Sequence, residues 1–491
     1  MIGVCAEMMK KIWIVLVILV ACMSSSFSVC AFSPYENYTY PAEMDGHKPE
    51  PQAYLPNGVL TGKSIGITDF ANPSDIYISE EGRIYISDAG NNRIVVLDKE
   101  LSLVEVITSF ERNGVLDSLS SPSCVFVDGE EMIYIADTDN DRIVVLHSDY
   151  RFCREYTLPE ATLLEGIDFA PSKVVVDHSG RMFVISPNCN KGMIGLDKDG
   201  QFNGFYGVLE TGNTLDIFKY FATDEQRKTM EQSIPVAYSN MTVDDEGFVY
   251  TTVALTDISG GYNPDIFIRK LNPSGKDVLV RRGSYDIIGD VVFYNNGEVQ
   301  ENSSFVDITV MGDNCYSALD SRYGRIFTYD KDGNLLYVFG AKGQSEGQFS
   351  NPVSLAELDG TYFVLDRNYN QIVVFEPTEY GTLLLEAASK YSVRDYEGAE
   401  ECYDKLLVQS VYSDVAYRGK GNCLYQRQEY AEALKYYKFC ENRDMYIEVF
   451  KYYLSDLANR YFVVGMSTIL GFIVIGGSIM FIRKRKKERM K

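Results

Sequence analysis

The sequence predicts a mainly β protein: a six-bladed β-propeller with a small α-helical neck and one transmembrane helix. Three observations predict this architecture. A unit of 49 residues recurs in the first part of the chain, a 34-residue helical period begins after Pro377, and 462–482 contains no charged residue. A chain of 491 residues is long enough to hold all three parts.

The repeat is clearest in two similar decapeptides, DAGNNRIVVL from Asp88 and DTDNDRIVVL from Asp137. Each unit reads as short runs of alternating or continuous apolar residues separated by turn residues, the pattern of a four-stranded blade. Three prolines mark the same place in successive units at intervals of 49 residues: Pro73, Pro122 and Pro171. Three looser units follow at 239–283, 304–340 and 351–376. Together these units predict six blades.

The chain resembles the NHL-repeat family of β-propellers in three segments: YISDAGNNRIVVLD, YIADTDNDRIVVLH and the junction FGAKGQSEGQFSNP. The resemblance implies a propeller over 54–376. In the third unit the recurring acid is replaced by Ser186, so the role of the acid is lost or substituted there. Because an open ring would leave an unpaired sheet edge, we expect 54–60 to supply the outer strand of the sixth blade.

The recurring corner lies between the second and third strands of a blade, a position that shares one mouth of the ring with the connections between blades. Its candidate binding residues are Asp88, Asn92, Arg93, Asp137, Asp139 and Arg142. They could bind a ligand at this mouth. Alternatively, the short side chains bond to turn backbone and each Arg pairs with a neighbouring acid. Recurrence in several blades favours the structural interpretation, because ligand sites usually break the symmetry of a repeat.

The symmetry breaks at an insert, 209–235, between the third and fourth blades. Its connectivity places it at the same mouth, and it adds three candidate binding residues: Phe218, Tyr220 and Phe221. These rings could form a ligand wall or could pin the insert to the propeller.

We expect no cofactor and no metal. The segment DTDND from Asp137 has the alternating acids of a calcium loop but lacks the following Gly and the distal Glu. The three histidines, His47, His147 and His178, are spread over different parts of the predicted fold. Seven cysteines follow the N-terminal signal region, with no zinc-type spacing among them.

The neck at 382–449 contains two helical units, in which Tyr396, Ala399 and Tyr403 recur 34 residues later. Small residues and aromatics at this period resemble tetratricopeptide repeats. The resemblance implies a stiff spacer or a groove for a partner segment, and two repeats favour the spacer. We expect 450–460 to continue as a juxtamembrane helix.

Both ends of the chain indicate a membrane. Residues 1–31 read as a signal peptide, cleaved after Ala31 or, alternatively, lipidated at Cys22, and 32–53 read as an extended linker. The transmembrane helix at 461–482 is followed by a basic cytoplasmic tail at 483–491. We therefore expect a single-pass protein of the cell membrane with the bulk of the chain extracellular.

The formal net charge of −23 makes nucleic-acid binding improbable. Motifs such as Gly-x-Ser-x-Gly or HExxH are missing from the sequence. We expect a membrane-anchored extracytoplasmic binding or scaffold protein, not an enzyme, that uses a propeller face for a protein or glycan partner at the cell surface, for example as an accessory to a solute-uptake system. The alternative is a calcium-dependent lactonase-like or other propeller hydrolase.

Overall fold

The computed structural model describes residues 35–40, 46–187, 189, 191–208, 237–253, 266–283, 285–293, 299–312 and 315–488. The chain divides into two compact units, Met1–Pro34 and Tyr35–Lys491, and the first lies outside the described residues. The predicted signal peptide and the insert at 209–235 therefore lie outside the described part of the chain.

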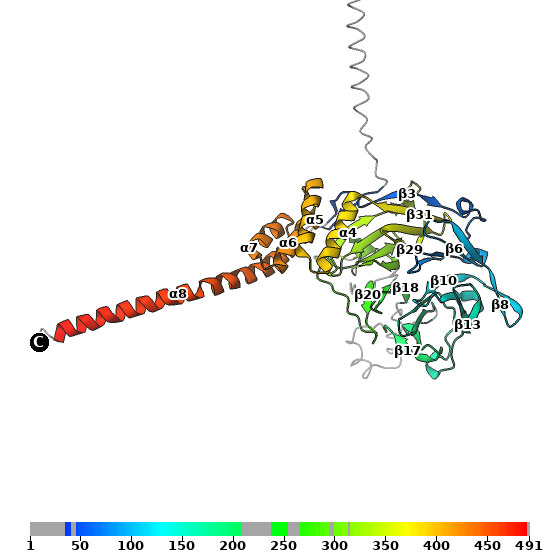
Figure 1. Cartoon of the computed structure of the whole chain (residues 1–491), viewed down its shortest axis with the longest axis horizontal. Coiled ribbons are helices and arrows are strands. Elements are labelled where there is room, and N and C mark those ends of the chain that lie inside the picture. The colour runs from blue at the N-terminus through cyan, green and yellow to red at the C-terminus, as the bar shows by residue number, and fades with distance from the viewer. Residues whose placement is uncertain are drawn as a thin grey trace, which may run out of the picture. The chain divides into compact units, whose positions relative to one another are not determined.

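Six antiparallel sheets form the blades (Figure 1). Blade one contains β4 (Asp75–Ile78), β5 (Ile84–Asp88), β6 (Arg93–Leu97) and β7 (Leu103–Ile107). Blade two contains β10 (Pro122–Val127), β11 (Ile133–Asp137), β12 (Arg142–Leu146) and β13 (Phe152–Tyr156). Blade three contains β14 (Lys173–Val176), β15 (Met182–Ile185), β16 (Met193–Leu196) and β17 (Phe202–Tyr206).

Blade four has three described strands, β18 (Tyr238–Val243), β19 (Val249–Val253) and β20 (Ile268–Leu271). Blade five contains β23 (Phe305–Val310), β24 (Tyr316–Asp320), β25 (Arg325–Tyr329) and β26 (Leu335–Phe339). Blade six contains β29 (Pro352–Leu358), β30 (Thr361–Asp366), β31 (Gln371–Pro377) and β3 (Tyr54–Leu60). The innermost strands contact one another in the cyclic order β4, β10, β14, β18, β23, β29 and back to β4, which closes the six-bladed ring.

The ring closes as the sequence predicts. β3 pairs antiparallel with β31, with Tyr54 opposite Pro377 and Leu60 opposite Ile372. The N-terminal side of the propeller therefore completes the last blade, and the prediction for 54–60 is confirmed. This pairing removes the free edge that β31 would otherwise present to solvent.

The apolar runs of the repeat follow from the way in which blades stack. A second or third strand has a neighbouring blade on each face, so all five residues of β5 and all five of β6 are buried. The outer strand β7 has solvent on one side, and its first three residues are exposed. Continuous apolar runs for inner strands and mixed outer strands are therefore the expected pattern.

Short two-stranded sheets accompany the six blade sheets. They are β1 (Tyr38–Thr39) with β2 (Lys48–Pro49), β8 (Ser109–Arg112) with β9 (Val115–Ser118), β21 (Val291–Phe293) with β22 (Val299–Asn302), and β27 (Ala341–Lys342) with β28 (Gln348–Phe349).

The segment predicted as an extended linker is packed where the structure describes it. Tyr38 is 2% exposed, and the Asn37 Oδ1 atom accepts a hydrogen bond of 3.0 Å from the Val338 N–H in β26. Glu50 accepts hydrogen bonds from the Tyr380 hydroxyl at 2.8 Å and from the Asp414 N–H at 3.0 Å. The segment thus covers the edge of blade five and fastens the helices that follow the propeller.

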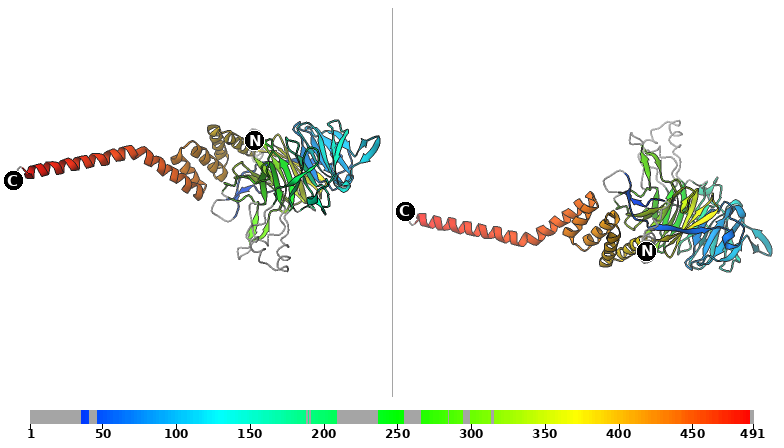
Figure 2. Two further views of the ribbon diagram at one scale, coloured as in Figure 1. Left: turned by 90° about the horizontal axis from the view of Figure 1, so that it is seen from below. Right: turned by 90° about the horizontal axis from the view of Figure 1, so that it is seen from above.

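Five helices follow the propeller in the described part of the chain (Figure 2). They are α4 (Glu379–Ser392), α5 (Tyr396–Gln409), α6 (Asp414–Gln426), α7 (Tyr430–Phe439) and α8 (Arg443–Glu488). The Thr378, Asp395 and Ser413 side chains cap α4, α5 and α6. Ala399 and Ala433, which correspond at the 34-residue period, are both fully buried. The tetratricopeptide-like assignment itself stays a prediction.

The last helix combines three predicted elements. α8 runs without interruption through the expected juxtamembrane and transmembrane segments and into the basic tail. It is long and apolar enough to cross a membrane. Its apolar side chains between Tyr461 and Ile482 are largely exposed, as expected of a helix surrounded by lipid.

Candidate functional site

The recurring corner of blade one is closed by an internal ion pair. The Arg93 Nε atom donates to the Asp88 Oδ2 atom at 2.7 Å, and the Arg93 guanidinium also donates to the Thr68 hydroxyl and carbonyl at 2.8 Å each. The other Asp88 oxygen accepts from the Ala71 N–H at 2.7 Å. The corner therefore binds the connection that enters its own blade, and both charges are satisfied within the chain.

Blade two repeats this arrangement with an additional acid. The Arg142 Nε atom lies 2.8 Å from the Asp137 Oδ2 atom, and the two Arg142 terminal nitrogens donate to the Asp117 oxygens at 2.7 and 3.0 Å. The remaining Asp137 oxygen accepts from the Ser120 N–H at 2.6 Å. These contacts are those that the structural interpretation of the repeat predicts.

The predicted binding residues thus divide into three groups. Asp88, Arg93, Asp137 and Arg142 are buried, whereas Asn92 and Asp139 are exposed. Phe218, Tyr220 and Phe221 lie outside the described residues. The proposed binding role of the exposed pair and of the insert stays a prediction.

The corner changes in blades three and five. In blade three the Ser186 hydroxyl accepts from the Ala170 N–H at 3.2 Å, so Ser takes over the backbone contact that Asp makes in blade one. In blade five Arg325 pairs with Asp290 instead of its corner acid. Asp290 also accepts from the Tyr38 hydroxyl at 2.7 Å. Burial would raise the pKa of Asp290, but its contacts with His47, Arg325, Tyr40 and Tyr38 lower it to about 2.

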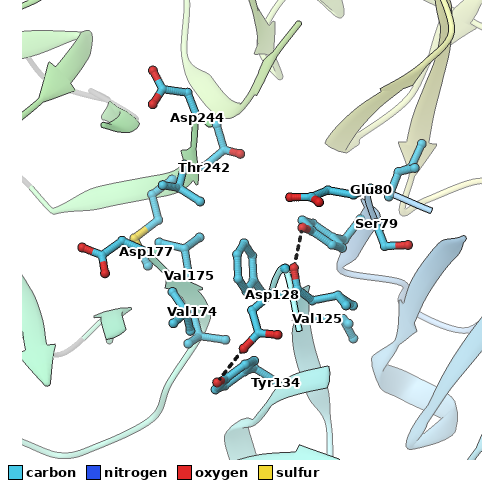
Figure 3. A pocket seen from close by; sticks show the side chains of 18 of the residues that line it. Ser79, Glu80, Val125, Asp128, Tyr134, Val174, Val175, Asp177, Thr242 and Asp244 are labelled. Atoms are coloured by element: carbon cyan, nitrogen blue, oxygen red, sulfur yellow. Dashed lines mark hydrogen bonds between the residues drawn. The ribbon is translucent and has the colours of Figure 1, made fainter. Parts of the chain in front are cut away.

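A cavity of about 880 Å³ lies at the opposite mouth, where the first strand of each blade turns into the second (Figure 3). It is lined by the ends of all six innermost strands and, in every blade except the fifth, by residues of the turn that follows. Apolar side chains such as Val125, Val174 and Val175 contribute to its walls (Figure 3). Sequence reasoning placed the candidate site at the other mouth and did not find this cavity.

Some acids at the rim of the cavity stabilise the turns that they begin. Asp128, Asp177 and Asp244 each accept two backbone N–H groups of the turn that they begin. Asp177 also pairs with Arg181 at 2.6 Å, and Asp244 pairs with Lys270 at 3.0 Å. These carboxylates are engaged in maintaining the fold.

Other acids at the rim are exposed. They are Glu80, Glu130, Asp199, Asp245 and Asp359. None of these five forms an ion pair with another residue in the part of the chain that the structure describes. The cationic groups of the lining are fewer: Arg154, Lys173 and Lys198. The rim therefore presents uncompensated negative charge around a partly apolar cavity.

Each blade contributes one residue to a set at the inner end of the cavity, of which Lys173 and Asp307 line it. The six stand at the same register on the innermost strands: Asp75, Cys124, Lys173, Asn240, Asp307 and Ser354. We call this set the floor ring. In blades one, two, three and six it is the second residue after the recurring proline. That alignment was available from the sequence, and it shows a position where the repeat varies.

Four members of the floor ring are bonded to one another. The Lys173 Nζ atom lies 2.8 Å from the Asp75 Oδ1 atom. The Ser354 hydroxyl lies 3.0 Å from the same Asp75 oxygen and 2.6 Å from the Asp307 Oδ2 atom. Burial raises the pKa of Asp307 to about 6, although Lys173 opposes this shift. The contacts form a network that reaches across blades one, three, five and six.

In the described residues there is no group of three or more His, Cys, Asp or Glu side chains placed to hold a metal ion. His178 lies at the rim, where its Nε2 atom is 2.8 Å from the Asp245 carbonyl oxygen. His47 is not among the residues that line the cavity, and its Nε2 atom lies 3.2 Å from the Asp290 Oδ1 atom. The seven described cysteines are free thiols.

The comparison with protein families identifies the repeat of the first blade. The NHL repeat family matches residues 70–97, so this stretch is an NHL-type repeat. A comparison with curated proteins finds no match.

Solved structures with a similar arrangement include a streptogramin B lyase (TM-score 0.40, 14% identity, covering 66% of this chain and 98% of that chain). A virginiamycin B lyase from Staphylococcus aureus gives a TM-score of 0.41 at 11% identity, covering 66% of this chain and 99% of that one. A putative gluconolactonase gives a TM-score of 0.38 at 11% identity, covering 70% and 98%. Likeness at this level carries no argument about activity.

Proposed function

We propose that this chain is a membrane-anchored extracytoplasmic binding protein, and that its propeller takes a positively charged, partly apolar segment of a partner protein at the cell surface. The observation that supports this proposal is the cavity of about 880 Å³ with its exposed, unpaired rim acids. Concave, partly apolar sites with a few polar groups are the usual form of a binding site. A neutral glycan would leave the rim charge without a counterpart.

The anchor is consistent with this role. The apolar part of α8 is followed by basic residues at the end of the same helix, which the positive-inside rule places in the cytoplasm. The propeller would then lie outside the cell, held by the helical neck.

We do not propose catalysis for the cavity. The buried or half-buried acids of its lining are Asp128, Asp177, Asp244, Asp307 and Glu357, and each accepts at least one backbone N–H group. A calcium-dependent hydrolase needs several oxygen ligands that converge on one ion. Calcium that binds stoichiometrically and supports lactone hydrolysis would contradict the binding role.

The test uses the full-length protein in detergent and N-acetylated tetralysine amide as the probe, followed by calorimetry at low salt. N-acetylated tetraglutamate amide is the matched probe of opposite charge. The test variant is the triple substitution Glu80→Gln, Glu130→Gln and Asp359→Asn at the rim. We expect it to weaken tetralysine binding about tenfold, because three attractive charges are removed from one cavity.

The control variant removes the same charge from the opposite mouth: Asp139→Asn, Asp141→Asn and Glu165→Gln. We expect this variant to bind tetralysine as the wild type does. Equal losses in the two variants would mean that the acidic surface attracts cations without a site. Tetraglutamate binding of similar strength would exclude the proposed ligand class.

A further inference from the structure

The hydrogen-bonding contacts of the floor ring need one more hydrogen than its side chains supply when both of its carboxyl groups are ionised. The Ser354 hydroxyl accepts a hydrogen bond of 3.2 Å from the Ile76 N–H and lies within bonding distance of two carboxylates. A hydroxyl has one hydrogen to donate and two lone pairs. If Asp75 and Asp307 are both ionised, one of the two contacts with Ser354 has no hydrogen in it.

One additional proton satisfies every contact. A protonated Asp307 donates from its Oδ2 atom to the Ser354 oxygen, and Ser354 donates its own hydrogen to Asp75. Ser354 then uses one donor and two acceptor positions, and Lys173 completes the neutralisation of Asp75. The chain Asp307, Ser354, Asp75 and Lys173 is therefore fully hydrogen-bonded in the protonated form.

The groups that face Asp307 divide into two sets. The Asp75 carboxylate and burial favour the protonated form, and Asp307 is only 3% exposed. Lys173, a hydrogen bond donated by Ser354, and two backbone N–H groups, Leu355 at 2.7 Å and Ile308 at 2.8 Å, favour the ionised form. The Cys124 thiol lies beside Asp75 and Lys173, and its raised pKa keeps it neutral. These opposing effects hold the pKa of Asp307 near neutrality at about 6.

The proton has a route to solvent. Lys173 and Asp307 both line the cavity, so the floor ring is in contact with the space that a ligand would occupy. With the proton bound, Asp75 and Lys173 leave the ring neutral. Without it, the ring carries one negative charge beneath the cavity.

We propose that the floor ring binds one proton on the Asp307–Ser354 pair and releases it through the cavity, so that the charge beneath the bound ligand switches between zero and minus one. The proposal rests on the cation-binding function proposed above. It makes the affinity for a positively charged ligand higher when the proton has left, and lower in mildly acid surroundings.

The first experiment detects the proton without any ligand. Infrared spectra of the full-length protein in detergent are recorded from about pH 4.5 to pH 8, and the spectra of Asp307→Asn are subtracted. We expect a protonated-carboxyl band in the difference that disappears around pH 6. Ser354→Ala should shift this titration, because it removes the hydroxyl that accepts the proton. A difference without a titrating carboxyl band overturns the proposal.

The second experiment measures tetralysine affinity over the same pH range. N-acetylated tetralysine amide keeps its charge there, so a change in affinity reports on the protein. We expect the wild type to bind about fourfold more tightly at pH 7.5 than at pH 5.5, and Asp307→Asn to lose about that difference. A titrating band together with pH-independent tetralysine binding would retain the proton site but overturn its effect on the ligand. A titrating band without any tetralysine binding would retain the proton site and contradict the cavity as a cation site.

Discussion

The two mouths of the propeller follow opposite rules. At the mouth with the recurring corners, blades one and two use the same pair, Asp88 with Arg93 and Asp137 with Arg142. At the floor of the cavity, neighbouring blades never share a residue type at the equivalent position, which is occupied in turn by Asp, Cys, Lys, Asn, Asp and Ser. Repetition marks a contact that stabilises the blades that share it. Variation marks a position that is free to acquire one particular chemistry.

The two regions also differ in how their charges are satisfied. In blades one and two each corner Asp has an Arg of its own and backbone donors, so its carboxylate is balanced close to its own blade. In the floor ring, one Lys serves two carboxylates that come from different blades. The corners are local, and the floor ring depends on the closed ring of blades.

The largest effect is expected from Lys173→Met. The substitution leaves Asp75 buried without its cation, and removing one partner of a buried ion pair costs about 3–5 kcal/mol. The measurement is the free energy of unfolding in urea, followed by circular dichroism on the full-length protein in detergent. Lys63→Met, which breaks an exposed pair with Asp69, is the matched control and should cause no measurable change. Equal effects would show that the floor ring is not a buried network.

A somewhat smaller effect is expected from Arg142→Ala. Arg142 is 8% exposed and contacts Asp137 and Asp117, so its loss leaves a fully buried carboxylate unpaired. We expect a loss of about 3 kcal/mol in the same unfolding measurement. Arg151→Ala removes an exposed arginine paired with Asp149 and should leave stability unchanged. Stability equal to the wild type in Arg142→Ala would refute the structural role of the corner.

The six-bladed ring could be predicted from the sequence because each blade repeats its own pattern of strands and turns. The proline interval gave the blade length, and the echo at 54–60 gave the closing strand, which β3 confirms. The cavity could not be predicted in this way. It is formed by residues from six distant parts of the chain, and no single stretch of sequence carries it.

The packed segment before the propeller was missed for a related reason. Its buried side chains follow no local periodicity, and their partners lie far along the chain. Tyr38 contacts Asp290, and Glu50 contacts Tyr380. Such contacts are set by the tertiary fold and not by local propensity. The insert at 209–235 was the feature that the sequence favoured as a binding surface, and it stays a prediction.

Stability should depend on pH in an unusual direction. Burial raises the pKa of Glu50 to about 7 and that of Asp320 to about 6, whereas unfolded carboxyl groups titrate near pH 4. The folded state therefore keeps protons that the unfolded state has already lost. The free energy of unfolding should fall as the pH rises from about 4 to 7, and should level off above that range.

The Glu50→Gln variant isolates one of these groups. Glu50 faces Tyr380, Ser413 and Asp414. A Gln side chain at this position is neutral and neither binds nor releases a proton in this pH range. We expect a flatter dependence of the urea midpoint on pH between about 4 and 7 than in the wild type. Glu36→Gln, at an exposed position close by in sequence, should retain the wild-type slope. A steeper slope in Glu50→Gln would contradict the sign of the shift.

The smallest expected effect is a change in ligand affinity that distinguishes the two mouths of the propeller. Glu130→Gln and Asp139→Asn each remove one exposed acid, from the cavity rim and from the recurring corner respectively. Both should change stability by less than about 0.5 kcal/mol, because neither side chain is buried or paired. In the tetralysine titration, Glu130→Gln should weaken binding about twofold and Asp139→Asn should leave it unchanged. The reverse result would move the binding surface to the mouth of the recurring corners, because only a charge that lies near the bound ligand can change its affinity at a Debye length of about 10 Å.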